Sequence, residues 1–299
     1  MTISETNKML LVGDNPFHGI SHLSEDRIRV RGDNPRNVEF AAQLVLTSVD
    51  NGANGFMFSV SDTTLSILQL VSKKVESHQL TLHAIVPYAY EYVRSATRLG
   101  TMGLAKKLAR RMIMSGNLTS IRHGLMGIVG MNPNELMKTY LTYEISRVKS
   151  SIGKRHSLTS VLLHEVITDM IIALDLDWLA KSYISFLSSL QIKPGFETRN
   201  FAYLVHKFKQ WGIDFDRIEI VTSFNKVGFQ MNPSKIECEK ALEEIPECDI
   251  IAMSILAAGY IRLPEAAGYI EKLPNLRGVV VGVSKEYHAR ETFRFLKSI

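Results

Sequence analysis

Residues 277–293, with the sequence RGVVVGVSKEYHARETF, decide the fold class of this chain. The apolar, β-branched run Val279–Val281 predicts a buried strand. This strand leads through Gly282 and a short polar turn into a helical pattern that we expect to begin near Lys285. A strand followed so closely by a helix is the repeating unit of α/β proteins, so the same unit should recur along the chain.

The turn between this strand and this helix predicts an anion-binding site. Gly282 would let the backbone approach a ligand closely, and Ser284 is a residue type that caps helices. The exposed amides at the amino end of a helix favour an anion, most often a phosphate. Lys285 and Arg290 add positive charge nearby. An ordinary capped turn is the alternative, because single Gly-Ser turns are common.

Seven further short apolar runs precede this strand. They are Met9–Gly13, Gly55–Val60, Leu80–Val86, Ser160–His164, Ile192–Glu197, Ile218–Thr222 and Ile250–Ser254. With Val279–Gly282 they make eight, and most are almost continuously apolar, as in parallel strands covered on both faces. Helical patterns fill the gaps, so the chain predicts an α/β fold of the (β/α)8 TIM-barrel type. A doubly wound open sheet is less favoured, because no Gly-x-Gly-x-x-Gly fingerprint follows the first strand.

The connection between the third and fourth predicted strands is longer than a barrel requires. Residues Tyr88–Thr159 span more than 70 positions, about twice the length of an ordinary loop and helix. We predict a helical insertion, residues 89–157, within a single barrel domain that spans residues 1–299. Residues 104–113 combine an apolar stripe with a basic face. A lid, a homo-oligomer contact, a membrane-surface helix and a helix packed on the barrel are the alternatives for this segment.

The composition limits the classes of function. The chain is 45% hydrophobic, so it can bury a large core, and its two cysteines provide neither a disulfide framework nor metal-ligand spacing. The polar amino-terminal stretch predicts no signal peptide, and no apolar run is long enough to cross a membrane. A net charge of +5 permits acidic partners but does not indicate nucleic acid. We expect a cytoplasmic protein that binds an anionic small molecule.

Polar residues follow the predicted strands, and in a barrel the carboxyl ends of the strands line the site. We select four of these residues as candidate catalytic residues: His18, Asp62, His164 and Glu197. His164 could polarise a carbonyl or move a proton, or it could be a core histidine held by a backbone carbonyl. Glu197 and Arg199 alternate along one strand, so a structural ion pair is as good an interpretation as catalysis.

A metal site is an alternative use of the same residues. Imidazole and carboxylate groups bind many metals, so His18, His164 and Glu197 could form a ligand set. No ligand spacing within one element supports such a set, and we assign no residue to a metal. A metal-dependent lyase or hydrolase therefore stays an alternative function.

Stretches of the carboxyl-terminal half resemble the aldo/keto reductase superfamily. AMSILAAGYI at residues 252–261 is similar to that family's Ala-Tyr-Ser-Pro-Leu-Gly-x-Gly-Leu-Leu segment, and residues 282–293 resemble its cofactor-phosphate turn. TRNF at residues 198–201 is similar to its Val-Ser-Asn-Phe motif, whose asparagine holds the nicotinamide carboxamide. The resemblance covers roughly residues 158–299 and implies a barrel that binds NADP(H). The cofactor-binding residues that it implies are Asn200, Arg199, Phe224, Ser254, Gly282, Ser284, Lys285 and Arg290.

Most catalytic residues of that family are missing from this chain. Leu162–His164 matches the strand that carries the family's catalytic histidine. The family's aspartate falls on Met57, its proton-donating tyrosine on Asp62, and its lysine near Val86 or Pro87. Without the tyrosine, hydride transfer to a carbonyl loses its proton source. The resemblance therefore implies the barrel and the phosphate turn more strongly than the reductase reaction.

Three functions stay open besides the metal-dependent one. The first is an enzyme that acts on a phosphate-bearing or nucleotide-dependent small molecule at the carboxyl-terminal mouth of the barrel. The second is an NAD(P)-dependent oxidoreductase in which Asp62 or His164 replaces the missing proton donor. The third is a catalytically silent protein that binds a ligand in the same mouth.

Overall fold

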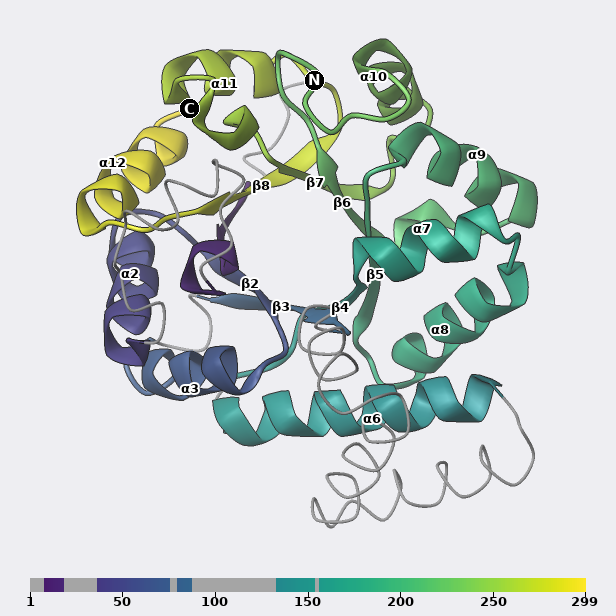
Figure 1. The fold of residues 1–299 in the computed structure, drawn as a ribbon, viewed down its shortest axis with the longest axis horizontal. Helices are drawn as coiled ribbons and strands as arrows, with labels where there is room; N and C mark the ends of the chain where they lie inside the picture. Colours follow the sequence, from purple (N-terminus) through teal and green to yellow (C-terminus); the bar gives the residue numbers. More distant parts are fainter. Residues whose placement is uncertain (1–7, 19–36, 76–79, 88–132, 154–155) are drawn as a thin grey trace, which may run out of the picture.

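A computed structural model of the chain confirms the predicted TIM barrel. The structure describes residues 8–18, 37–75, 80–87, 133–153 and 156–299. Eight parallel strands pair in chain order, and the last closes the barrel on the first (Figure 1). They are β1 (Met9–Gly13), β2 (Gly55–Ser59), β3 (Thr81–Val86), β4 (Ser160–Leu163), β5 (Lys193–Thr198), β6 (Glu219–Ser223), β7 (Asp249–Met253) and β8 (Leu276–Gly282).

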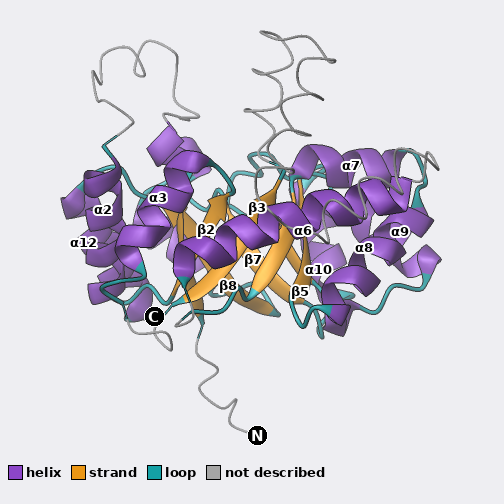
Figure 2. Ribbon diagram, turned by 90° about the horizontal axis from the view of Figure 1, so that it is seen from below, coloured by secondary structure: helices purple, strands orange, loops and turns teal. Residues whose placement is uncertain are grey.

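Helices surround the sheet on its outer side (Figure 2). They are α2 (Val38–Asp50), α3 (Asp62–Val71), α6 (Pro133–Ile152), α7 (Glu165–Ala173), α8 (Asp177–Ser189), α9 (Phe201–Trp211), α10 (Lys235–Glu243), α11 (Leu263–Ile270) and α12 (Glu286–Lys297). Short 3-10 helices are η1 (Asn15–His18), η3 (Phe215–Arg217) and η4 (Ala257–Gly259). Within the described ranges, no helix is long and apolar enough to span a membrane.

Only the last part of the predicted insertion can be compared with the structure. Helix α6 forms its carboxyl-terminal portion and packs against α3 and α8 on the outside of the barrel. Residues 88–132, which include the basic face at 104–113, lie outside the described residues. The prediction of an oligomer contact through this segment stays a prediction.

The core has two parts, one between the strands and the helices and one inside the barrel. The inner cluster contains Leu11, Met57, Ile85, Leu162, Val221, Ile251 and Val280, which come from every strand except β5. On β5 the inward position is Gly195, where an added Cβ would lie 2.5 Å from Cδ2 of Leu162. The Leu162 side chain therefore fills the space that a β5 side chain would otherwise take.

The alternation of side chains along the strands decides which residues reach the mouth. Two residues beyond the inner cluster come Gly13, Ser59, His164, Ser223, Met253 and Gly282, and Glu197 lies two residues beyond Gly195. Because successive side chains of a strand point to opposite faces, all of these positions face the inside of the barrel at its carboxyl end. His164 and Glu197 are thus placed at the mouth, as the strand ends predicted.

A buried polar cluster closes the opposite end of the barrel. Nδ1 of His83 lies 3.0 Å from Oε1 of Glu219, which also accepts a hydrogen bond from the Ser160 hydroxyl at 2.8 Å. Nε2 of His83 lies 3.1 Å from Oγ1 of Thr81. Burial opposes ionisation of Glu219, but the interactions with His83 and Ser160 outweigh it and lower the pKa of this carboxyl. The Glu219 carboxylate therefore stays charged inside the barrel.

Replacing Glu219 with Gln should destabilise the fold. The substitution leaves His83 buried without its charged partner, and breaking a buried pair from one side costs about 3–5 kcal/mol. Urea denaturation at neutral pH measures this loss. Glu265→Gln is the control, because it removes only an exposed pair with Lys226, which contributes at most about 1 kcal/mol.

Acidic pH should reduce the difference between Glu219→Gln and the wild type. A carboxyl whose pKa is lowered by folding contributes stability above its unfolded pKa, which is near 4.5, and loses it as the pH falls through the folded pKa. Equal destabilisation by Glu219→Gln and Glu265→Gln at neutral pH would contradict a structural role for the buried pair.

Candidate functional site

The first part of the site is the polar segment after β1. The Asp14 side chain is buried, and its Oδ2 accepts a hydrogen bond from the backbone N–H of Ser59 at 2.7 Å. Nε2 of His18 lies 3.0 Å from the same oxygen. A carboxylate can only accept hydrogen bonds, so the Nε2 of His18 carries the proton in this contact. Asp14 thereby ties the end of β1 to the end of β2 and orients His18.

His164 sits at the junction of β4 and α7. Its Nδ1 accepts a hydrogen bond from the backbone N–H of Val166 at 3.2 Å, so the side chain caps the helix. An Nδ1 that accepts has no proton, so Nε2 carries it in the neutral ring. Burial lowers the pKa of His164 despite the opposing effect of the neighbouring Glu165 carboxylate. His164 is therefore a neutral hydrogen-bond donor at the mouth of the barrel.

Glu197 carries the largest electrostatic perturbation at the mouth. Its Oε2 lies 3.4 Å from the backbone N–H of Glu165. Burial raises the pKa of Glu197 to about 8, and repulsion from Glu165 and Asp14 adds to the effect, while Arg199 and the Glu165 amide oppose it. At neutral pH this carboxyl is mostly protonated and can donate a proton.

Arg199 does not pair with Glu197. Its Nε donates to Oε2 of Glu165 at 2.5 Å, so the guanidinium binds the first residue of α7. This contact corrects the interpretation of a direct ion pair along β5. It leaves Glu197 as a carboxyl without a bound cation among the described residues.

Asn200 is held by the protein itself. Its Nδ2 donates to Oδ2 of Asp169 at 2.8 Å, and the Thr198 hydroxyl donates to Oδ1 of the same carboxylate at 2.5 Å. Burial raises the pKa of Asp169, although these hydrogen bonds and one from the Arg199 backbone oppose the shift. The turn after β5 is therefore fastened to α7.

The turn after β8 differs from the prediction in the residue that caps α12 and in the residue at which α12 begins. The N-cap of α12 is Lys285, with no capping bond from a side chain, so Ser284 does not cap this helix. The helix begins one residue later than a Ser284 cap requires, at Glu286. At Gly282, an added Cβ would lie 2.9 Å from Cγ and Cδ of Pro16, so the glycine makes room for the Asp14–His18 segment. Arg290 pairs with Glu286 within the first turns of the helix.

Three other predicted residues occupy different surroundings. Asp62 begins α3 with a side chain that is 74% exposed and pairs with Arg147 of α6, away from the inward-facing positions. The Phe224 ring is fully buried and makes an edge contact with Phe201 at 5.5 Å between ring centroids. It cannot offer a face to a ligand. Ser254 follows β7 in a left-handed backbone conformation and is partly exposed.

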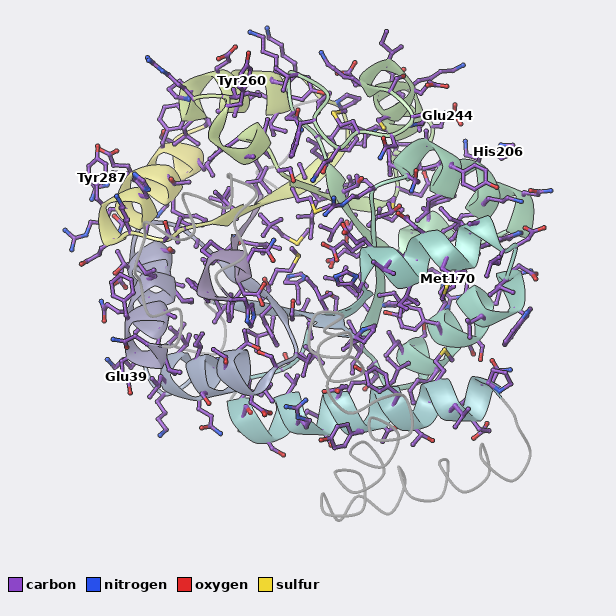
Figure 3. All side chains as sticks on the ribbon, viewed as in Figure 1. Glu39, Met170, His206, Glu244, Tyr260 and Tyr287 are labelled. Atoms are coloured by element: carbon purple, nitrogen blue, oxygen red, sulfur yellow. The ribbon has the colours of Figure 1, made fainter. Side chains whose placement is uncertain are left out.

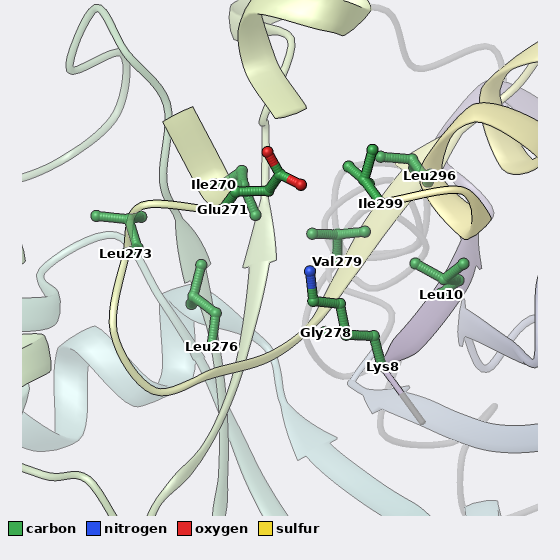
Figure 4. A pocket seen from close by; sticks show the side chains of 10 residues that line it. All are labelled: Lys8, Leu10, Ile270, Glu271, Leu273, Leu276, Gly278, Val279, Leu296 and Ile299. Atoms are coloured by element: carbon green, nitrogen blue, oxygen red, sulfur yellow. The ribbon is translucent and has the colours of Figure 1, made fainter. Parts of the chain in front are cut away.

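Side chains that point away from the barrel are readily seen in Figure 3. Tyr260 lies within the family-like segment 252–261 and is 82% exposed. The cavity in Figure 4 is also outside the mouth: it lies by the starts of β1 and β8 and the carboxyl-terminal residues. Its lining is mainly aliphatic, with Lys8 and Glu271 at its edge. Neither feature belongs to the candidate site.

The described part of the chain contains no metal-ligand set. No group of three or more His, Cys, Asp or Glu side chains there is arranged to hold a metal ion. Asp14, Glu165 and Asp169 are site residues that the sequence did not identify. Two sequence signals could have indicated them. Asp14 lies in the polar segment after β1, and Glu165 and Asp169 are spaced four residues apart near the start of a helix. That spacing places both on one helix face.

The residues at the mouth do not fit a nicotinamide held in the way that the resemblance implies. Asn200, which would bind the carboxamide, is engaged with Asp169, and Arg199 is engaged with Glu165. Pro16 lies beside Gly282, which is exposed. The start of α12 does fit a phosphate, because its first amides lack a side-chain cap and Lys285 is exposed.

Known structures share this fold at low sequence identity. Two structures of a protein of Pseudomonas aeruginosa assigned to the aldo-keto reductases match with TM-scores of 0.58 and 0.57, at 10% and 11% identity. Each match covers 97% of this chain and 89% of the other. An aldo-keto reductase from Bacillus halodurans, in its holo form, matches with a TM-score of 0.50 and 11% identity over 86% of this chain and 82% of its own.

No protein-family model and no curated protein matches the sequence. The similarity is thus one of structure, spread over nearly the whole chain. The chain has a TIM-barrel fold like that of the aldo-keto reductases.

Proposed function

We propose that this chain is an enzyme that moves protons on a small polar ligand at the mouth of the barrel, with Glu197 as the proton donor. The observation that carries the proposal is the place of Glu197 at the mouth, near Glu165 and without a bound cation among the described residues. Burial and the neighbouring carboxylates raise its pKa to about 8. A general acid works best when its pKa lies near the working pH. Glu197 meets this condition, whereas the exposed Asp62, paired with Arg147, does not face the same space.

His164 supplies the second function that such a reaction needs. As a neutral ring with its proton on Nε2, it can donate a hydrogen bond to a carbonyl or leaving-group oxygen. Leu163 pairs with Phe196, so the next residues, His164 and Glu197, occupy neighbouring positions at the ends of adjacent strands. From these positions both would act on the same oxygen of the ligand. The reaction class is general acid catalysis at an oxygen atom.

The Asp14–His18 pair completes the ring of titratable groups. The charge of Asp14 raises the pKa of both His164 and Glu197, so Asp14 lies near both side chains. Burial shifts the two pKa values in opposite directions, and groups perturbed in this way are concentrated at acid–base sites. This clustering favours an enzyme over a silent binding protein.

We place the phosphate of the ligand at the start of α12. The uncapped amides and the exposed Lys285 support this position. Gly282, which begins the turn, faces the barrel interior at the same end as His164 and Glu197. The ligand is therefore a phosphate-bearing small molecule whose other end reaches Glu197.

The pH dependence of stability tests the state of Glu197. A carboxyl whose pKa is raised by folding makes the folded state bind an extra proton between about pH 4.5 and pH 8, so stability falls as the pH rises through this window. Glu197→Gln keeps a neutral side chain of similar shape and should lose this slope. Its stability relative to wild type should increase from about pH 5 to about pH 9, measured by urea denaturation.

Glu265→Gln serves as the matched control, because Glu265 is an exposed surface glutamate paired with Lys226. Its stability relative to wild type should stay flat over the same range. A parallel pH profile for Glu197→Gln and wild type would contradict the role of Glu197 as a protonated acid.

A nicotinamide-dependent oxidoreductase with Glu197 as its rebuilt proton donor is the second candidate function. The fold and the uncapped start of α12 favour it, but the engaged Asn200 does not. Calorimetric titration should compare NADPH with adenosine 2′,5′-bisphosphate, which keeps the phosphate end and lacks the nicotinamide. We expect similar dissociation constants for the two. NADPH binding at least about tenfold tighter, or about 1.4 kcal/mol, would favour the oxidoreductase instead.

A further inference from the structure

The Ser223 hydroxyl is a polar group that the structure leaves without a partner. Ser223 ends β6 and is fully buried. It lies two residues beyond Val221 of the inner cluster, so its side chain also faces the inside of the barrel. Among the described residues, its Oγ has no hydrogen-bond partner.

Ser223 is placed among the groups of the proposed acid site. Glu197 on β5 pairs in register with Val221 on β6. Ser223 is the next inward-facing residue of β6 after Val221, on the side of the mouth. In a TIM barrel, inward side chains of alternate strands form one layer. His164 after β4 and Ser223 on β6 therefore flank Glu197 on β5 from its two sides.

Met253 is the inward neighbour of Ser223 on the other side. The two Cα atoms pair in the register of β6 and β7, and the Met253 side chain is partly exposed. A methionine side chain is unbranched and changes its conformation readily. Met253 is therefore an adaptable side chain on the strand position next to Ser223.

An unpartnered hydroxyl inside a barrel lowers stability. Burying a polar group without a hydrogen bond has a free-energy cost, and the same hydroxyl can recover that cost by bonding to a ligand. A serine hydroxyl both donates and accepts, and a neighbouring protonated carboxyl does the same. Ser223 and Glu197 can therefore each bind an oxygen atom of one ligand.

We propose that Ser223 binds a ligand hydroxyl next to the oxygen that Glu197 protonates, so the ligand is a polyhydroxylated, sugar-like phosphate ester. This proposal rests on the proposed acid site and adds the class of ligand. In this proposal Ser223 is a substrate-binding residue, and its hydroxyl forms a hydrogen bond with the ligand.

The stability of Ser223→Ala in the absence of ligand is the first test. Removing an unpartnered buried hydroxyl should raise the melting temperature of the free protein. Ser160→Ala is the matched control, because Ser160 is a buried barrel serine whose hydroxyl donates to Glu219 at 2.8 Å. Its melting temperature should fall. A fall for Ser223→Ala as well would show that its hydroxyl is already satisfied and would overturn the proposal.

Binding of two phosphate esters is the second test. Glycerol 3-phosphate has two adjacent hydroxyls, and n-propyl phosphate has the same carbon chain without them. Calorimetry should show that wild type binds glycerol 3-phosphate about tenfold more tightly, and that Ser223→Ala removes this preference and keeps its affinity for n-propyl phosphate.

The outcomes separate the two proposals. Equal affinity for the two esters in wild type, or a preference that persists in Ser223→Ala, overturns the role of Ser223 and leaves the phosphate site standing. Failure of both esters to bind contradicts both the phosphate site and the ligand class. The acid site is tested separately, by the pH dependence of the stability of Glu197→Gln.

Discussion

The pairing of β8 with β1 is the constraint on which the rest of the structure depends. It runs from Met9 opposite Gly278 to Gly13 opposite Gly282, and it closes the sheet. Closure fixes the inward and outward faces of all eight strands at once. It also brings the Asp14–His18 segment beside the turn after β8, where Pro16 packs over Gly282. The ends of the chain thereby help to build one mouth.

The glutamates at the two ends of the barrel have pKa values shifted in opposite directions. At the amino end, Glu219 faces His83 and Ser160, and these partners keep its pKa low. At the carboxyl end, Glu197 lies near the carboxylates of Glu165 and Asp14, and Arg199 is bound to Glu165. The pKa of Glu197 is therefore raised. Burial acts on both, so the difference comes from the neighbours. The hydrogen-bonded pair of Glu219 and His83 suits a structural role. Glu197, which lies near other carboxylates, suits proton transfer.

The fold could be predicted from the sequence because each strand is a short apolar run. The run Val279–Val281 and its seven counterparts carry the signal locally, and no long-range information is needed to recognise them. His164 and Glu197 could be placed at the mouth for the same reason, since each follows such a run. The barrel was therefore predictable even though its sequence identity to known structures is about a tenth.

The contacts within the site could not be predicted, because they join residues far apart in the chain. Asp14 bonds to Ser59 across 45 positions, and Asn200 bonds to Asp169 across 31. The local motif at Asn200 indicated a free amide, whereas the carboxylate that holds it lies on another helix. At Ser284 the local pattern misplaced the start of α12 by one residue, which is a common uncertainty at helix ends.

The family-like segments predicted the fold better than the contacts at the mouth. The turn after β8 keeps a phosphate-compatible helix start, whereas the nicotinamide end of the same pattern is occupied by the protein's own side chains. Fold similarity does not decide the reaction, which depends on the groups at the mouth. At this mouth His164 has a lowered pKa and Glu197 a raised one, and on these two groups we base the proposal of an acid site.

The most direct test of this account is the pKa of the Glu197 carboxyl, measured by carbon-13 NMR on protein labelled at the glutamate side chains. Comparison with Glu197→Gln assigns the signal. The account predicts a titration midpoint near 8, well above the ordinary value of about 4.5. A midpoint near the ordinary value would show that Glu197 is ionised at neutral pH, and it would contradict the proposed acid site.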